Sequence, residues 1–333
     1  MNETPGQQPA FVSPLGSHIQ RYLQFKRAAG NRYREEEREL GVLDRFLASR
    51  LTASDPLIDE KIIQGYLSQN SALSQKTKQT RLSLLRQLCL FIAQEEPRTA
   101  IPPSRFLGIR RNLFIPRIFT RAEARLFLQA CACLSKGRGS PLRGMVHGTA
   151  LMLLYLTGIR LGEVLSLNLE DVDLIQGVLK IRQGKFGKSR LVPMAPDLTY
   201  RMRQCRRFVE RFVDLRPSSG CFFPGPKGAR CTKHALRYSF RKVLTAASIP
   251  WLGAGKGPRL HDLRHSFAVH RMILWYEQGA DLGTKLPLLA TYLGHVSLSS
   301  SQHYLRLTED LLGEVTRRYQ SRFGHLITER RSR

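Results

Sequence analysis

The chain has 333 residues, and 42% of them are hydrophobic, so it is long enough for two domains with buried cores and wholesale disorder is not expected. Its 53 Lys and Arg residues outnumber the 26 Asp and Glu residues, which gives a formal charge of +27 at pH 7. Such a surplus repels itself unless a polyanion neutralises it, and nucleic acid is the obvious polyanion. A basic protein without such a partner remains the alternative on charge alone.

The cysteines and the apolar runs of the sequence indicate the cellular compartment of the protein. None of the six cysteines forms a CxxC pair or a Cys/His set with zinc-ligand spacing, so we expect no metal site. Cys89 and Cys131 fall in apolar, helix-like runs and are interpreted as small core residues. The start of the chain is polar, and no apolar run approaches the roughly 18 residues of a membrane span. We therefore predict a reduced, cytoplasmic protein with no membrane segment.

Residues 15–95 predict a small all-helical module, because apolar residues recur there at helical intervals. The expected helices begin at Leu15, at about Tyr33, near Ile62 and after Ser74. The hydroxyl of Ser74 suits the N-cap of the fourth helix.

The start of that fourth helix carries cations and hydroxyls on one face. This combination suits contacts with the phosphates of a nucleic acid. The candidate contacts are Lys76, Thr77, Lys78 and Arg81. The alternative interpretation is a solvated surface face.

Residues 96–118 are predicted to form a linker, because their prolines interrupt any helix and favour extended chain. The segment also contains Arg105, Arg110 and Arg111, which would suit a connector that runs along a phosphate backbone.

A second domain is predicted over residues 119–325, and Thr120 with Glu123 forms a capping-box pattern at its first helix. Its further expected helices lie at 145–155, 161–165, 197–215 and 232–247, and around His261. Two segments alternate like strands, 178–181 and 190–193, and a glycine-punctuated hairpin loop joins them.

Two arginines and a histidine form the first candidate site. Arg160 follows an apolar helix and a glycine turn, and Glu163 lies one helical turn further on, where it could fix the guanidinium. His261 and Arg264 have the same i, i+3 spacing and reach one point above a helix, whose first turn Asp262 could cap. Cations, a nucleophile and proton carriers are what chemistry on a phosphodiester needs. Each pair alone is more often a local salt bridge or a chance pattern.

Three further residues could complete such a site. Lys185 lies in the hairpin loop, and a desolvated lysine can donate a proton to a leaving oxygen, although a solvated loop lysine is the alternative. His295 follows a helix stop, and Tyr304 is a candidate nucleophile. The rival phenols are Tyr276, Tyr292 and Tyr319.

Four motifs together resemble the tyrosine recombinase (phage integrase) family. They are TGIRLGEVLSL at 157–167, GKFGKSRLVP at 184–193, HDLRHSFAVH at 261–270 and YLGHVSLSSSQHYL at 292–305. The resemblance implies a mainly α fold, in which an N-terminal helical core-binding (SAM-like) domain precedes a mixed α+β catalytic domain with a small antiparallel sheet. The helical module at 15–95 matches the core-binding domain in size and place.

The resemblance also implies a role for each candidate residue. By this resemblance, Arg160 and Arg264 would clamp the scissile phosphate, and Glu163 would be a supporting acidic residue. Lys185 would act as general acid on the 5′-oxygen, and His261 would act as a proton carrier. His295 would hydrogen-bond the phosphate, and Tyr304 would attack it to give a 3′-phosphotyrosine. Lys188 and Arg190 are added as candidate DNA contacts. The bond energy would stay in the phosphotyrosine, so no metal, ATP or other cofactor is expected.

Family behaviour further implies double-stranded DNA as partner and a homotetramer on two DNA sites, with helper recombinases as candidate partners. Residues 286–295 resemble transposon-borne members, which favours a mobile-element recombinase that acts in integration or transposition. The helical spacing after Tyr304 suits docking on a neighbouring subunit or on its own domain. Two other classes stay open, a DNA-binding regulator that does not cut and a topoisomerase-like nicking and closing enzyme.

Overall fold

The computed structural model describes residues 11–31, 33–69, 72–104, 116–134, 142–182, 189–212, 220–225, 228–251, 253 and 257–294. The chain separates into two compact units, Met1–Leu113 and Phe114–Arg333, and each has its own hydrophobic core. Within the described ranges, none of the helices is long and apolar enough to cross a membrane.

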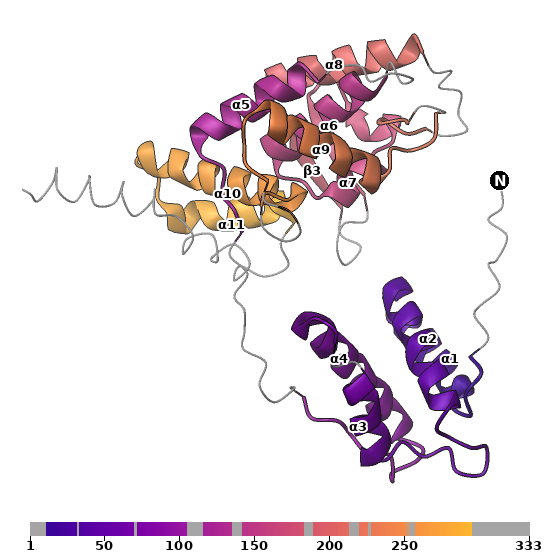
Figure 1. Cartoon of the computed structure of the whole chain (residues 1–333). Coiled ribbons are helices and arrows are strands. Elements are labelled where there is room, and N and C mark those ends of the chain that lie inside the picture. The colour runs from indigo at the N-terminus through magenta and orange to yellow at the C-terminus, as the bar shows by residue number, and fades with distance from the viewer. Residues whose placement is uncertain are drawn as a thin grey trace, which may run out of the picture. The chain divides into compact units, whose positions relative to one another are not determined.

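The first unit is built from helices (Figure 1). They are α1 (Gly16–Ala28), α2 (Arg34–Ala48), α3 (Glu60–Gln69) and α4 (Gln75–Ile92). Their apolar stripes meet in one core, in which Tyr22, Leu40, Leu47 and Leu85 are fully buried. The four helices expected from the apolar spacing are therefore confirmed.

A side-chain cap and a buried carboxylate hold two parts of the first unit. The hydroxyl of Ser74 accepts the N–H of Thr77 at 3.2 Å, which confirms the predicted N-cap of α4. Asp44 of α2 is buried, and its carboxylate accepts the N–H groups of Val12 and Ser13 at 2.7 and 3.1 Å. This buried carboxylate ties the chain before α1 to α2.

The second unit combines helices with a small antiparallel sheet (Figure 1). Its helices are α5 (Arg121–Ala132), α6 (Leu142–Thr157), α7 (Leu161–Ser166), α8 (Pro196–Glu210), α9 (Lys233–Ala246), α10 (Leu260–Glu277) and α11 (Leu282–Leu293), with a short 3-10 turn η1 (Leu169–Asp171). The strands β1 (Val172–Asp173), β2 (Val178–Ile181) and β3 (Arg190–Pro193) lie in the order β1-β2-β3, and Ile181 pairs with Arg190. The predicted mainly α fold with a small antiparallel sheet is thus confirmed, and β1 is an addition of two residues.

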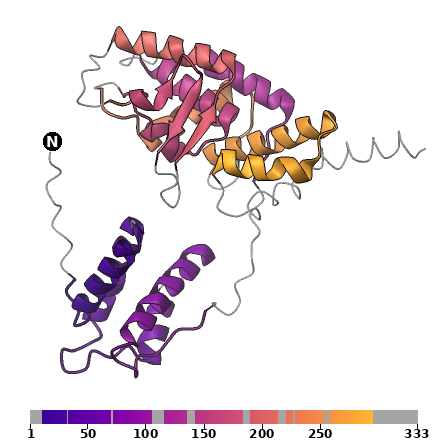
Figure 2. The same cartoon turned by 180° about the vertical axis from the view of Figure 1, so that it is seen from behind.

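α6 is the central helix of the second unit, and it contacts α5, α8, α9 and α10. Apolar residues occupy every side of it, which is the pattern of a fully buried helix. Gly148 lets α5 approach closely, because an added Cβ would collide with the carbonyl of Cys131. Cys131 is itself fully buried, as predicted. Figures 1 and 2 show α10 and α11 lying together at one end of this unit.

α11 forms although Pro287 lies inside it. Proline has no N–H, so one helical hydrogen bond is missing there. Asp281 begins the helix by accepting the N–H groups of Gly283 and Thr284, and Leu289 packs with α10 residues in a separate apolar cluster. The helix stop expected at Leu293 and Gly294 is confirmed, because α11 ends at Leu293 and the left-handed Gly294 caps it, whereas the start of this helix was not predicted from the sequence.

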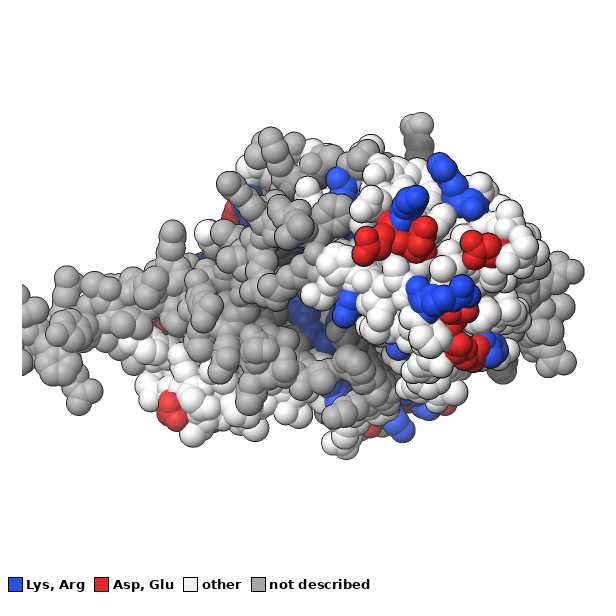
Figure 3. Space-filling view, turned by 90° about the horizontal axis from the view of Figure 1, so that it is seen from below, with Lys and Arg blue, Asp and Glu red and all other residues white. Residues whose placement is uncertain are grey.

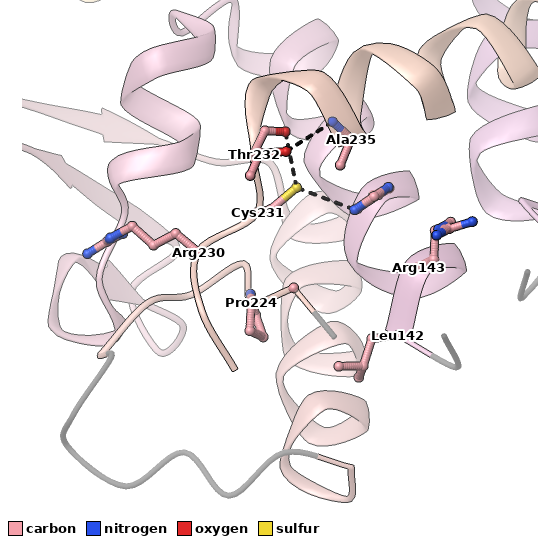
Figure 4. Close-up of a pocket in the computed structure, with 9 residues that line it drawn as sticks. Leu142, Arg143, Pro224, Arg230, Cys231, Thr232 and Ala235 are labelled. Carbon is pink, nitrogen blue, oxygen red and sulfur yellow. Dashed lines mark hydrogen bonds between the residues drawn. The ribbon is translucent and has the colours of Figure 1, made fainter. Parts of the chain in front are cut away.

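A buried chain of polar groups lies between α6 and α9. His147 of α6 bonds Ser239 through Nδ1 at 2.7 Å and the Cys231 thiol through Nε2 at 3.3 Å. Figure 4 shows the Cys231 contact beside a cavity of about 180 Å³, which Leu142 and Arg143 help to line. Burial, with a smaller effect of the Arg143 charge, lowers the pKa of His147 to about 4. The imidazole is therefore neutral over the whole physiological range.

We predict that His147 makes the second unit less stable as the pH falls from about 6.5 toward 4. The unfolded chain binds a proton on this histidine below its ordinary pKa, whereas the native ring stays neutral until about pH 4, so unfolding is favoured across this window. The loss at the acid end is about 3 kcal/mol of unfolding free energy. Urea unfolding followed by tryptophan fluorescence measures it, because Trp251 and Trp275 both lie in this unit.

The variant His147→Gln should lose this part of the pH slope and keep the part that comes from carboxylates. The exposed His234 of α9 supplies a matched control, and His234→Gln should keep the wild-type slope. If His147→Gln also kept that slope, the buried imidazole would not be its source.

Candidate active site

The turn after α6 places Arg160, and it depends on a glycine. Gly158 has a φ of +63°, in the left-handed region, and an added Cβ would meet the Phe267 ring at 2.5 Å and Leu293 at 3.0 Å. The chain reverses at this residue, passes through the buried Ile159, and sets Arg160 at the N-cap of α7.

Glu163 of α7 fixes Arg160 in two ways. Its Oε2 accepts the main-chain N–H of Arg160 at 2.8 Å, and its Oε1 accepts Nη1 of the guanidinium at 2.9 Å. The glutamate side chain is only 8% exposed, against 26% for the arginine. The contact that the i, i+3 spacing indicated is therefore present, and it holds the guanidinium at the edge of the core.

Arg264 of α10 is a buried cation with 2% of its surface exposed. Its Nη1 donates to the carbonyl of Gly158 and its Nη2 to the carbonyl of Leu293, both at 2.7 Å. These carbonyl dipoles replace water that a guanidinium would otherwise bind. Asp262 accepts the main-chain N–H of Arg259 at 2.8 Å, so it caps the first turn of α10 as predicted.

The last turn of α11 brings three arginines together. The bonds are from Nε of Arg190 to the carbonyl of Tyr292 at 2.8 Å, from Nη2 of Arg264 to that of Leu293 at 2.7 Å, and from Nη2 of Arg160 to that of Gly294 at 2.6 Å. Carbonyls at a helix C-terminus lack helical partners and carry the negative end of the helix dipole, so they attract cations. The consecutive acceptors therefore bring the guanidiniums of Arg160 and Arg264 to the same helix end.

Arg190, which the sequence made a candidate DNA contact, is held by protein groups in the structure. Its side chain is 11% exposed, and Nη1 and Nη2 donate to Oε1 and Oε2 of Glu163 at 3.0 and 2.8 Å. With the bond to Tyr292, all three of its guanidinium nitrogens bond to protein atoms. The pairing was missed because Arg190 and Glu163 are 27 residues apart on different elements, and no local pattern joins them.

Glu163 carries the negative charge at the centre of this group. Burial raises its pKa, but hydrogen bonds from Arg190 and from the main-chain N–H of Arg160 outweigh burial and hold the pKa below its ordinary value. One carboxylate is thus shared by two guanidiniums, and Arg264 adds a third positive charge. In the part of the chain that the structure describes, no group of three or more His, Cys, Asp and Glu could hold a metal ion.

His261 stands at the start of α10, one turn before Arg264, and the residue as a whole is exposed although its ring is partly desolvated. Desolvation on its protein side and the charge of Arg264, with a smaller effect of Arg160, lower its pKa. The ring meets His265 edge to face, with centroids 4.7 Å apart. The structure therefore gathers Arg160, Arg264 and His261 in one place, and this environment favours the neutral form of the histidine.

Tyr292 is a poor rival to Tyr304 as nucleophile. Its phenol donates to the carbonyl of Pro193 at 3.4 Å, and its ring stacks on Phe267 with centroids 5.7 Å apart. Burial raises the pKa of this phenol to about 12, so the phenol is held in a packing role. Other candidates lie outside the described residues, namely Lys185, Lys188, His295, Tyr304 and Tyr319.

The candidate DNA contacts of α4 differ in their surroundings. Lys76 is exposed, whereas Arg81 is 15% exposed and donates from Nε to Glu39 of α2 at 2.7 Å. The main-chain N–H of Thr77 serves the Ser74 cap.

Figure 3 shows that basic and acidic side chains are interspersed over the described residues of the face that it presents. Net charge alone therefore does not mark the contact surface.

Comparison with known proteins gives the relatives of this chain. Residues 119–310 match the model of the Phage integrase family. The integrase/recombinase y4rE of Sinorhizobium fredii is 35% identical over 310 residues, which cover 93% of this chain and 97% of the relative. The tyrosine recombinase XerD of Haemophilus influenzae is 27% identical over 267 residues, which cover 80% of this chain and 84% of the relative.

Two solved structures share the fold. One is the XerH site-specific recombinase in a post-cleavage complex with palindromic difH substrate, with a TM-score of 0.62, 23% identity, and coverage of 84% of this chain and 79% of that one. The other is the Tn1549 transposon integrase in complex with transposon right end DNA, with a TM-score of 0.61, 16% identity, and coverage of 86% and 94%. The chain therefore belongs to the phage integrase family and is a site-specific tyrosine recombinase.

Proposed function

We propose that this recombinase cleaves and rejoins double-stranded DNA through Tyr304, whose phenol attacks the scissile phosphate and forms a 3′-phosphotyrosine. The observation that carries the proposal is the meeting of Arg160 and Arg264 at consecutive carbonyls of α11, immediately before His295 in the sequence. Two adjacent guanidiniums complement the two non-bridging oxygens of a phosphodiester.

The two arginines would act on the phosphate in different ways. Arg160 is the more exposed, so it would contact the phosphate from the open side of the site. Arg264 is buried, and its charge would act at short range through a medium of low dielectric constant. Because protein bonds already hold both side chains, their charges are in place when negative charge develops in the transition state.

Three residues would manage protons and hydrogen bonds. A neutral His261 would accept the proton that the phenol of Tyr304 loses, and its lowered pKa supports this role. Lys185 would donate a proton to the leaving 5′-oxygen, and His295 would hydrogen-bond the phosphate. In a second attack, the free 5′-hydroxyl would break the phosphotyrosine bond and rejoin the strand.

Neither ATP nor a metal ion is needed in this scheme. The energy of the broken phosphodiester is kept in the phosphotyrosine, so rejoining needs no further source. The guanidiniums of Arg160 and Arg264 supply the positive charge that a metal ion supplies in other phosphoryl-transfer sites.

The assembly that we propose is a homotetramer on two DNA sites. The lambda integrase was solved as a tetramer bound to a Holliday junction, and the Tn1549 integrase was solved with transposon DNA. In this assembly residues 15–95 form the core-binding domain, 96–118 the linker and 119–325 the catalytic domain. The tail after Tyr304, whose apolar residues have helical spacing in the sequence, would dock on a neighbouring subunit. Helper recombinases are candidate partners, and the DNA would be the end of a mobile element.

We predict that Tyr304→Phe abolishes covalent attachment to DNA, because the ring keeps its shape and loses its attacking oxygen. Wild-type protein incubated with a nicked candidate core site should give a protein–DNA adduct on a denaturing gel, in EDTA and without ATP. Tyr319→Phe, which removes a rival phenol, should leave the adduct unchanged. An adduct that survives in Tyr304→Phe would exclude this nucleophile, and loss of the wild-type adduct in EDTA would exclude the metal-free scheme.

We predict that Arg160→Ala and Arg264→Ala each slow cleavage at least about 100-fold, because each removes a charge aimed at the phosphate. Binding of the core site, measured by gel shift, should weaken only a few-fold. Arg271→Ala is a matched control on the same helix as Arg264, and it should cleave normally. Near wild-type cleavage by either clamp variant would contradict the assignment. Because Arg264 is buried, Arg264→Ala also removes contacts of the core. The variant Arg264→Lys and thermal unfolding curves are therefore measured as controls for folding.

We predict that the rate of cleavage by the wild-type protein falls at acid pH with a midpoint below 6.5, the ordinary pKa of histidine. The neutral ring is the form that accepts a proton, and the lowered pKa keeps His261 neutral to a more acid pH. Single-turnover cleavage over a pH series measures this limb, and His261→Asn should remove it. A limb that persists in this variant would belong to another group.

A further inference from the structure

All three guanidinium nitrogens of Arg190 donate hydrogen bonds to protein atoms. It is the first residue of β3, opposite Ile181 of β2, so it stands at the base of the hairpin whose loop contains Lys185. Its guanidinium makes a two-bond contact with Glu163 and a third bond to the main chain of Tyr292. The side chain of Arg190 is only 11% exposed, so the surrounding protein restricts the movement of its guanidinium plane.

The partners of Arg190 lie on the elements that carry the proposed reactive residues. Glu163 binds both the main chain and the guanidinium of Arg160, so a shift of this carboxylate would move that arginine. Tyr292 lies in the last turn of α11, and His295 follows that turn in the sequence. β3, α7 and α11 therefore meet at one guanidinium.

The shape of the site fits this guanidinium closely. At Gly294, an added Cβ would lie 2.8 Å from Nη1 and 3.0 Å from Cζ of Arg190. Gly294 also has a φ of +70° and offers its carbonyl to Arg160. The absence of a side chain at this C-cap thus leaves the room that the plane of Arg190 occupies.

We infer that Arg190 is a positioning residue of the cleavage reaction, which sets the orientation of Arg160 through Glu163 and holds the last turn of α11 beside it. The inference rests on the proposed function, since it concerns how the phosphate clamp is held. Arg190 does not touch the reacting atoms in this role.

Lysine cannot reproduce this arrangement. The two parallel bonds to Glu163 and the bond to Tyr292 need donors spread over a plane, whereas an ammonium is a single point of charge. Arg190→Lys would keep the net charge and lose the geometry. It therefore separates positioning from simple charge neutralisation.

The experiment compares Arg190→Met and Arg190→Lys with wild type and with Arg182→Met. Arg182 follows β2 in the same sheet and pairs with the buried Asp171, so Arg182→Met removes a similar ion pair away from Arg160. For each protein, three quantities are measured: the affinity for a core-site duplex, the single-turnover rate of adduct formation at saturating protein, and the thermal unfolding midpoint.

Positioning predicts a change in rate and not in binding. Arg190→Met should cleave about 100-fold more slowly, since small misplacements of a catalytic group have effects of this size. Its affinity for DNA should stay within about 3-fold of wild type. Arg190→Lys should recover less than a tenth of the wild-type rate, whereas Arg182→Met should cleave within about 3-fold of it.

The pH profile provides a readout that a merely structural loss would not change. The charged groups that face Glu163 are Arg160 from α7 and Arg190 from β3, and Arg190 lowers the pKa of Glu163 against the effect of burial. In Arg190→Met that pKa should rise, so the rate should gain a new acid limb. The limb should be missing from the double variant Arg190→Met/Glu163→Gln. His261, which faces Arg160 and Arg264, titrates in every variant and does not affect the comparison.

Two outcomes would overturn the inference. One is wild-type cleavage by Arg190→Lys, which should fold even if Arg190→Met does not. The other is a tenfold or greater loss of affinity with an unchanged saturated rate, the result expected of a direct DNA contact.

The Tyr304→Phe variant, run in parallel, separates this inference from the proposed function. If Tyr304→Phe still formed the adduct while Arg190→Met lost rate with unchanged affinity, the nucleophile would be wrong and the positioning role would stand. If Tyr304→Phe lost the adduct and Arg190→Lys cleaved normally, the reverse would hold.

Discussion

The site depends on how one helix end accommodates three cations. Arg160, Arg190 and Arg264 repel one another, and a single carboxylate, Glu163, is the acid that pairs with two of them. Main-chain carbonyls, which become available where α11 stops, add further compensation. The helix must therefore end at this point, and the left-handed Gly294 ends it.

This constraint explains features of the second unit that are costly in isolation. α11 retains Pro287 and loses a helical hydrogen bond, yet its last turn is held from outside by arginine bonds. Gly158 adopts a left-handed conformation that other residues disfavour, and in this conformation its carbonyl binds Arg264. The hydrogen bond missing at Pro287 is thus a local penalty offset by arginine contacts, whereas glycine adopts the left-handed conformation at 158 without strain and so presents its carbonyl to Arg264.

Much of the fold could be predicted from the sequence, because the signals are local. The Ser74 cap, the Thr120 capping box, the helices of the first unit and the β2–β3 pair each follow from residues within one or two turns of one another. The i, i+3 contact between Arg160 and Glu163 is of the same kind.

The remainder depends on contacts between distant segments. The end of α11 was predicted from Leu293 and Gly294, but its start was not, because the stretch around Pro287 is held as helix by packing on α10. The contacts of Arg190 could not be predicted, because its partner Glu163 lies 27 residues away on another element and no local pattern joins the two residues. For the candidate site, the sequence indicated the residue types, whereas only the structure showed which carbonyls hold them.

The bonds that hold Arg160 and Arg264 have a thermodynamic consequence for the encounter with DNA. A free arginine side chain on a surface loses up to about 2 kcal/mol of rotamer entropy when a ligand immobilises it. Here that loss is incurred during folding, since both guanidiniums are already bonded in the protein without DNA. The receptor is preorganised, so more of the interaction energy released on complex formation is left to distort the duplex toward its reactive shape.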